Sequence, residues 1–107
     1  MKYQIKFARQ AVRDMDKVWA DVFSASKSYD VASRYLNDLQ DAIENKSEFP
    51  KSGIPLYYED VFTGYYFIVF KAYLVFYRVE NTMLLVDRIL YGKSDYLRKL
   101  YVHSSKE

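Results

Sequence analysis

The fold is decided by residues 65–91, which read YYFIVFKAYLVFYRVENTMLLVDRILY. β-Branched and aromatic residues dominate this stretch, as is typical of strands. Lys71-Ala72 and Glu80-Asn81 interrupt it at the spacing of hairpin turns. We therefore predict three antiparallel strands, which span 65–70, 73–79 and 83–91.

Before this stretch the apolar residues follow other periods. Tyr3, Ile5 and Phe7 alternate with polar residues, which predicts a half-buried strand over 2–7. From position 8 to about 23 the apolar residues recur every three or four positions, and this period predicts an amphipathic helix. The apolar residues of that helix are Ala8, Val12, Met15, Trp19, Val22 and Phe23.

A polar segment, 24–28, separates this helix from a second one. Ser26 or Ser28 is a suitable N-cap for the second helix. The short link predicts an antiparallel helical hairpin. Pro50 and Pro55 disfavour helix, so the second helix must end before them. Its apolar residues are Val31, Tyr35, Leu36, Leu39 and Ile43.

The predicted order is strand, helix, helix and three strands. It describes an α+β fold, β-α-α-β-β-β, with a helical hairpin packed on one face of a mainly antiparallel sheet. The chain has 107 residues, and half of them are hydrophobic. This is the size of one domain with one core, so we expect residues 1–107 to form a single domain.

The composition excludes several kinds of site. The chain has no Cys and a single His, His103. A disulfide and a cysteine nucleophile are therefore excluded, and we expect neither a metal nor another cofactor. No run of about 18 apolar residues is present to span a membrane, and the N-terminus lacks the apolar region of a signal peptide. We expect a cytoplasmic protein with no membrane partner.

The positive charge lies in the last third of the chain. The net charge is only +2, but residues 71–107 carry seven basic and four acidic groups. Residues 1–70 carry nine basic and ten acidic groups. The total is too small to establish nucleic-acid binding, but its distribution is uneven, with the positive excess in the last third.

Four strings resemble, in order, those of the RelE/ParE superfamily. The opening strand leads into a helix at 3–8, and residues 49–55 are similar to the "FP..G.P" segment that is frequent on the ParE side. Residues 73–79 look like the family's "Y-apolar-apolar-x-Y-x-V" strand. Residues 88–96 resemble its closing "R-apolar-apolar-[HY]-G-[RK]-x-D" string. By this resemblance the chain is identified as a toxin of a bacterial type II toxin–antitoxin system.

The resemblance implies that a cognate antitoxin neutralises the protein, but it leaves two targets open. Relatives either cleave mRNA in the ribosomal A site or inhibit DNA gyrase. The basic, tyrosine-rich end of the chain favours the first, a ribosome-dependent and metal-independent endoribonuclease. The alternative is a ParE-type toxin that binds gyrase without catalysis. The absence of cations from 65–70 and the presence of Ser94 after Lys93 favour it.

RNA cleavage through a 2′-hydroxyl needs a general base, cations and a surface on which bases stack. Tyr96 could act as base or stacking platform, and Lys93 could neutralise the phosphate. The alternative without a functional role is that the cations are solvated surface groups and that the tyrosines pack in the core or at its rim. The candidates are Lys93, Tyr96 and Arg88 for catalysis, and Arg78, Tyr91 and Arg98 for RNA or phosphate binding.

Asp87 and Arg88 are adjacent, so on a strand they point to opposite faces. One of them must lie on the helix-packed face, at its margin or at a bulge. If the helices cover the face opposite Arg88, this side chain projects onto the open face alongside Arg78. Such a pair would bind phosphate or an acidic antitoxin.

The run 65–70 is apolar without alternation, which predicts burial on both faces or an exposed patch. The resemblance implies that an antitoxin segment covers part of it. The predicted antitoxin contacts are Tyr65, Phe67 and Val69.

Overall fold

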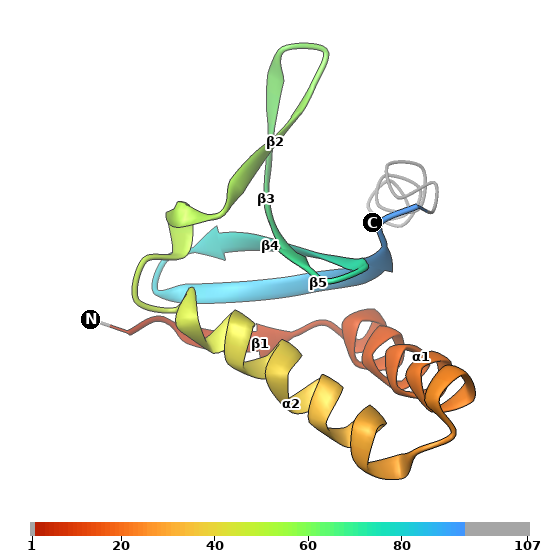
Figure 1. Ribbon diagram of the computed structural model, residues 1–107. Coiled ribbons are helices and arrows are strands. Elements are labelled where there is room, and N and C mark those ends of the chain that lie inside the picture. The colour runs from red at the N-terminus through yellow and green to blue at the C-terminus, as the bar shows by residue number, and fades with distance from the viewer. Residues whose placement is uncertain (1, 94–107) are drawn as a thin grey trace.

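The computed structural model describes residues 2–93, and it forms two layers. One layer is a helical hairpin of α1 (Arg9–Ser26) and α2 (Tyr29–Asn45). The other is a five-stranded sheet, and the helices lie along one of its faces (Figure 1). The predicted fold class is confirmed. The strands are β1 (Gln4–Phe7), β2 (Ile54–Tyr58), β3 (Val61–Phe70), β4 (Tyr73–Glu80) and β5 (Met83–Tyr91).

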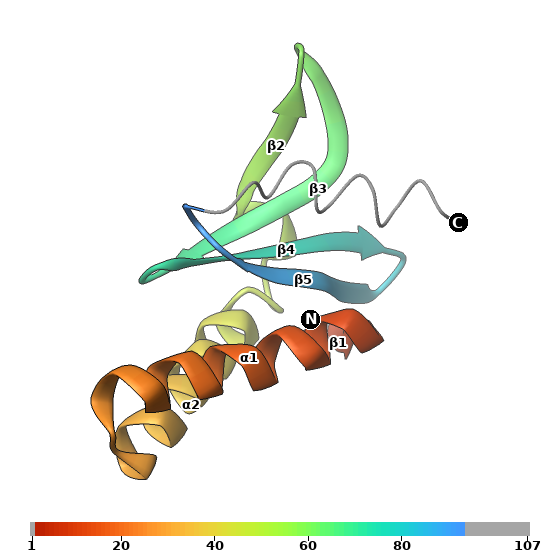
Figure 2. The ribbon, with the colours of Figure 1, turned by 90° about the vertical axis from the view of Figure 1, so that its right-hand side faces the viewer.

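The strand order in the sheet is β1-β5-β4-β3-β2. β1 pairs in parallel with β5, and the other pairs are antiparallel. The three strands predicted over 65–91 are β3, β4 and β5. β2 was not predicted. It follows a 3-10 turn, η1 (Pro50–Ser52), and forms with β3 a hairpin that projects away from the helices (Figures 1 and 2).

The structure tests the predicted start of α2 and the predicted apolar face of α1. Of the two predicted N-caps, Ser28 is the one that caps α2, since its side chain accepts a hydrogen bond from the Val31 amide at 3.2 Å. The predicted apolar stripe of α1 is partly wrong. Val12 and Phe23 are exposed, whereas the buried residues of the helix are Ala11, Asp14 and Val18.

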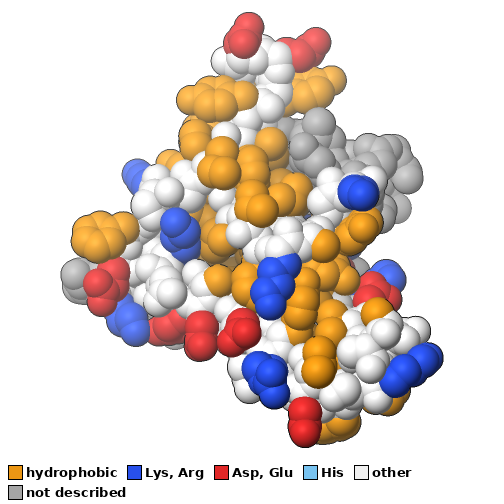
Figure 3. Space-filling model, viewed as in Figure 1, with side chains coloured by type: hydrophobic (Ala, Val, Ile, Leu, Met, Phe, Trp, Pro, Cys, Tyr) orange, Lys and Arg blue, Asp and Glu red, His pale blue; other side chains and the backbone are white. Residues whose placement is uncertain are grey.

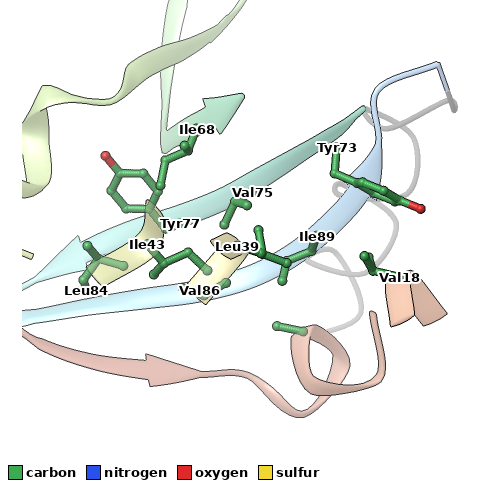
Figure 4. Close-up of a cluster of buried hydrophobic side chains, with 11 residues drawn as sticks. Val18, Leu39, Ile43, Ile68, Tyr73, Val75, Tyr77, Leu84, Val86 and Ile89 are labelled. Atoms are coloured by element: carbon green, nitrogen blue, oxygen red, sulfur yellow. The ribbon is translucent and has the colours of Figure 1, made fainter. Parts of the chain in front are cut away.

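The main core lies between the helices and the sheet (Figure 4). Leu39 and Ile43 of α2 pack there against strand residues that alternate with those of the other face. A second, smaller cluster consists of Leu56, Tyr65, Phe76 and Leu90. Phe76 lies between Val75 and Tyr77 of the main core, so alternation assigns this cluster to the face away from the helices. The strand residues of the main core include Val75, Tyr77, Leu84 and Val86.

The register of β4 and β5 shifts by one residue. Phe76 pairs with Arg88 and Tyr77 pairs with Val86, so Asp87 is an extra residue on β5. This is a β-bulge, one of the three positions predicted for the Asp87–Arg88 pair. Bulges bend a strand and re-aim the neighbouring side chains.

Candidate functional site

Asp14 joins α1 to the last residues of β5. Its Oδ2 accepts hydrogen bonds from Arg88 Nε at 2.8 Å and from the Ile89 amide at 2.9 Å. Its Oδ1 accepts from Arg88 Nη2 at 3.2 Å. The pairing of β1 with β5 ends at Phe7 and Val86. Beyond that point the Asp14 carboxylate does for the Ile89 amide what a strand carbonyl would do.

The Asp14–Arg88 ion pair is nearly enclosed. The Arg88 side chain is 12% exposed and that of Asp14 is 8% exposed. The register places Arg88 opposite Phe76, on the face away from the helices, but the guanidinium reaches α1. The bulge at Asp87 accounts for this direction. The expected position of Arg88 on the open face beside Arg78 is therefore wrong.

Arg78 has carboxylate partners of its own. Its Nε donates to Asp87 Oδ2 at 2.7 Å, and its Nη1 donates to Glu80 Oε2 at 3.2 Å. The hydrogen bond that Arg78 donates to Asp87 raises the pKa of Arg78, and the nearby negative charges add to the effect. The guanidinium also lies 6.0 Å from the centre of the Tyr65 ring. The structure thus gives Arg78 and Arg88 different carboxylate partners, Asp87 and Glu80 for Arg78 and Asp14 for Arg88.

A cleft of about 380 Å³ opens beside the Asp14–Arg88 pair, between α1 and the adjoining ends of β4 and β5. The Tyr73 hydroxyl donates to Asp21 Oδ2 at 3.4 Å, and Lys17 Nζ lies 3.3 Å from the same oxygen. Burial, with the charge of Asp21 added, raises the pKa of Tyr73 to about 12. This hydroxyl stays protonated near neutral pH. The lining residues are Gln10, Asp14, Lys17, Val18, Asp21, Tyr73, Arg88, Ile89, Leu90 and Tyr91.

Two other predicted site residues, Tyr91 and Lys93, lie close to the end of the described residues. Tyr91 is exposed at the rim of the cleft, and its ring centre is 5.8 Å from that of Tyr73. Lys93 is exposed just beyond Gly92, whose amide donates to the Ala72 carbonyl at 2.8 Å. Tyr96 and Arg98, also predicted as site residues, lie outside the described residues.

The three predicted antitoxin contacts share one face of β3. They are alternate residues, and Tyr65 and Phe67 pack in the second apolar cluster, away from the helices. Tyr65 is buried and Phe67 is half-buried, whereas Val69 is 57% exposed. Val69 is therefore the residue of the three that a partner can reach most directly.

Asp14 was missed by reasoning from the sequence. A signal was present, because Asp14 lies three residues after Ala11 and four before Val18, in register with the buried stripe of α1. A carboxylate in such a stripe needs a partner, since a lone buried charge is costly. The partner, Arg88, is 74 residues away in the sequence.

Comparison with known proteins gives one family and several solved structures of the same fold. The family model described as ParE toxin of type II toxin–antitoxin system, parDE, matches residues 5–96. No curated protein sequence matches the chain. In residues 2–93, no helix is long and apolar enough to cross a membrane.

Among the solved structures that share the fold are the following three. The chromosomal ParDE toxin–antitoxin system from P. aeruginosa contains a chain with TM-score 0.71 and 16% identity, covering 86% of this chain and 98% of that one. A mutant of the E. coli toxin RelE in the free state has TM-score 0.67 and 15% identity, covering 97% and 98%. The toxin–antitoxin complex RelBE2 from Mycobacterium tuberculosis has TM-score 0.58 and 21% identity, covering 85% and 99%.

Proposed function

Because the chain belongs to the ParE toxin family of type II toxin–antitoxin systems, we propose that it poisons its cell by binding DNA gyrase rather than by cutting RNA. One observation carries this choice. Arg78 and Arg88, the two strand cations expected to hold a phosphate, are each bound by a carboxylate. A toxin that acts by binding needs no such phosphate site.

The chemistry of RNA cleavage explains why this observation matters. The crowded phosphate of the transition state must be stabilised by positive charge, and a carboxylate beside each guanidinium would repel that phosphate. To free Arg88 for RNA, Asp14 would have to remain charged in a nearly enclosed position without its partner, which is costly. β3, the neighbour of β4 in the sheet, has no basic residue between positions 65 and 70 that could hold the phosphate instead.

The toxin's other partner in this proposal is its cognate antitoxin. The similar structures from P. aeruginosa and M. tuberculosis are a toxin–antitoxin system and a toxin–antitoxin complex. We place the antitoxin on the face of β3 that carries Tyr65, Phe67 and Val69. Apolar and aromatic side chains are gathered there, and Val69 is open to a partner.

A second candidate function, ribosome-dependent mRNA cleavage, rests on a different observation. Tyr91 and Lys93 are both exposed at the end of β5. Lys93 would neutralise the phosphate and Tyr91 would stack on a base. Tyr96 would be the general base, and Arg98 a further phosphate contact. In this version Arg88 would contribute only after separating from Asp14.

Two assays with the purified chain distinguish the candidates. The first follows supercoiling by DNA gyrase, and the second follows mRNA on translating ribosomes. We expect trapped gyrase–DNA complexes and intact mRNA, with the same result for Lys93→Ala and Tyr96→Phe. Codon-phased cuts that disappear in these variants, with gyrase unaffected, would replace this proposal by the second candidate. Normal growth of cells that contain the folded chain without antitoxin would contradict both.

A further inference from the structure

β2 is an edge strand of the sheet, and all of its side chains except that of Leu56 are exposed. The exposed fractions of Ile54, Tyr57 and Tyr58 are 50%, 56% and 53%. The hairpin of β2 and β3 projects from the body of the molecule, so the helices do not obstruct its outer edge (Figures 1 and 2). Within residues 2–93, the helices therefore leave this edge open to a second chain.

The edge also lacks the charges with which soluble proteins usually protect such strands. Neither β2 nor β3 contains a charged residue. The charged residues of the hairpin are Glu59 and Asp60, which form the turn at its tip. Figure 3 shows acidic side chains at the top of the molecule, with hydrophobic side chains below them. At the other end of β2, Lys51 is exposed in η1. The edge is thus apolar in the middle, acidic at one end and basic at the other.

We propose that a second copy of this chain pairs with β2 along this edge, antiparallel about a two-fold axis at Leu56. In this register Ile54 lies opposite Tyr58 of the second copy, and Pro55 lies opposite its Tyr57. The acidic tip of each copy then meets the Lys51 end of the other. The two sheets become continuous, and each Lys51 lies near the two carboxylates, Glu59 and Asp60, of the other copy.

Charge favours this occupant and this direction. A parallel arrangement would bring two acidic tips together, and like charges in contact are destabilising. An acidic antitoxin segment along the edge would also meet Glu59 and Asp60. Pro55 has no amide to donate, so it limits the number of backbone hydrogen bonds across the edge. Much of the association therefore comes from burial of Ile54, Tyr57 and Tyr58.

The proposal goes beyond gyrase binding and is tested by the oligomeric state of the full-length chain. Sedimentation equilibrium of the purified protein should show a reversible dimer. Tyr57→Lys places like charges near the two-fold axis and should make the protein monomeric. Tyr29→Lys is the matched control, since Tyr29 is 68% exposed but lies on α2, and this variant should dimerise as the wild type does.

The register has its own test by charge exchange. Lys51→Glu or Glu59→Lys alone should raise the dimer dissociation constant about three- to tenfold at low salt, because each disturbs two symmetric surface ion pairs. The double variant Lys51→Glu/Glu59→Lys should return to within about twofold of the wild type. Circular dichroism shows whether each variant is folded. If Tyr57→Lys does not fold, the charge exchange alone decides.

Three results would overturn the proposal. The first is a wild-type chain that stays monomeric up to its solubility limit. The second is a dimer that Tyr57→Lys leaves intact or that Tyr29→Lys disrupts equally. The third is a double charge exchange that is weaker than both single variants. A monomer whose complex with antitoxin is lost in Tyr57→Lys would assign the edge to the antitoxin instead.

Discussion

The Asp14 side chain attaches α1 to β5 through Arg88 and the Ile89 amide, and its substitution tests how much this attachment stabilises the fold. Asp14→Ala leaves the Arg88 charge nearly enclosed without a partner and the Ile89 amide without its acceptor. We expect the free energy of unfolding to fall by about 3–5 kcal/mol, as for other broken buried ion pairs. Urea unfolding followed by circular dichroism measures this change.

The matched control is Asp16→Ala, because Asp16 lies on the same helix but is exposed. This substitution should change the free energy of unfolding by no more than about 0.5 kcal/mol. Equal effects of the two substitutions would mean that Asp14 contributes only through helix formation. Arg88 would then be free enough to serve an RNA phosphate, and this result would favour mRNA cleavage over gyrase binding.

Tyr77 makes stability depend on pH in the alkaline range. Its ring is buried, its hydroxyl donates to the Pro50 carbonyl, and burial raises its pKa from 10.0 to about 12. The folded state therefore holds this proton more tightly than the unfolded state. The resulting stabilisation is complete below pH 10 and is lost as the pH rises towards 12.

Urea unfolding at about pH 9 and about pH 11.5 tests this dependence. The wild type should lose stability between the two values, and Tyr77→Phe should lose less because residue 77 no longer titrates. Some loss should remain in the variant, since the pKa of Tyr73 is also raised to about 12. Identical losses in both proteins would show that Tyr77 does not contribute.

At the scale of elements, the same tyrosine fixes the path from η1 into β2. Gly53 has no Cβ, and one placed there would lie 2.2 Å from the Tyr77 hydroxyl oxygen. The backbone of Gly53 is extended, so the requirement is for space and not for an unusual dihedral angle. Gly53→Ala must therefore displace Tyr77 or the start of β2.

We expect Gly53→Ala to lower the free energy of unfolding by about 1–3 kcal/mol, as overpacking of a core does. In a Tyr77→Phe background the clashing oxygen is absent, and the cost should be smaller by about 1 kcal/mol or more. The four proteins form a double-mutant cycle measured by urea unfolding. An additive result would mean that the two side chains do not compete for this space.

The elements with a regular apolar period could be predicted from the sequence, and β2 could not. The strands within residues 65–91 can be predicted because β-branched and aromatic residues dominate this stretch. β2 contains Pro55, which argues against a strand unless that strand lies at an edge, and edge position is known only from the assembled sheet. Its turn was equally hidden, because Glu59 and Asp60 take positive φ angles of 49° and 67° without a glycine.

At the scale of the whole molecule, the sequence supplied the residue types of the site but not their partners. Arg78 and Arg88 were recognised as candidate phosphate ligands from local strings. Their neutralisation depends on a bulge at Asp87 and on Asp14, which lies on the first helix. Such contacts follow from the packing of distant elements, which the period of one segment does not encode.

The position of the antitoxin gives the last prediction. The probe is the protein encoded beside the toxin gene, added to the purified chain. A partner that binds only the folded toxin raises the toxin's free energy of unfolding. The increase is about 2.7 kcal/mol when the partner's concentration is one hundred times the dissociation constant. Val69→Glu places a charge within the apolar face of β3, so it should weaken binding at least about tenfold and remove at least about half of the added stability.

Val31→Glu is the matched control, because Val31 is 41% exposed on α2, away from this face. It should retain the affinity of the wild type in titration calorimetry and the same rise in unfolding temperature. If Val31→Glu weakens binding and Val69→Glu does not, the antitoxin lies on the helical hairpin. The apolar face of β3 would then be open to the toxin's target even in the neutralised complex, and neutralisation could not work by covering that face.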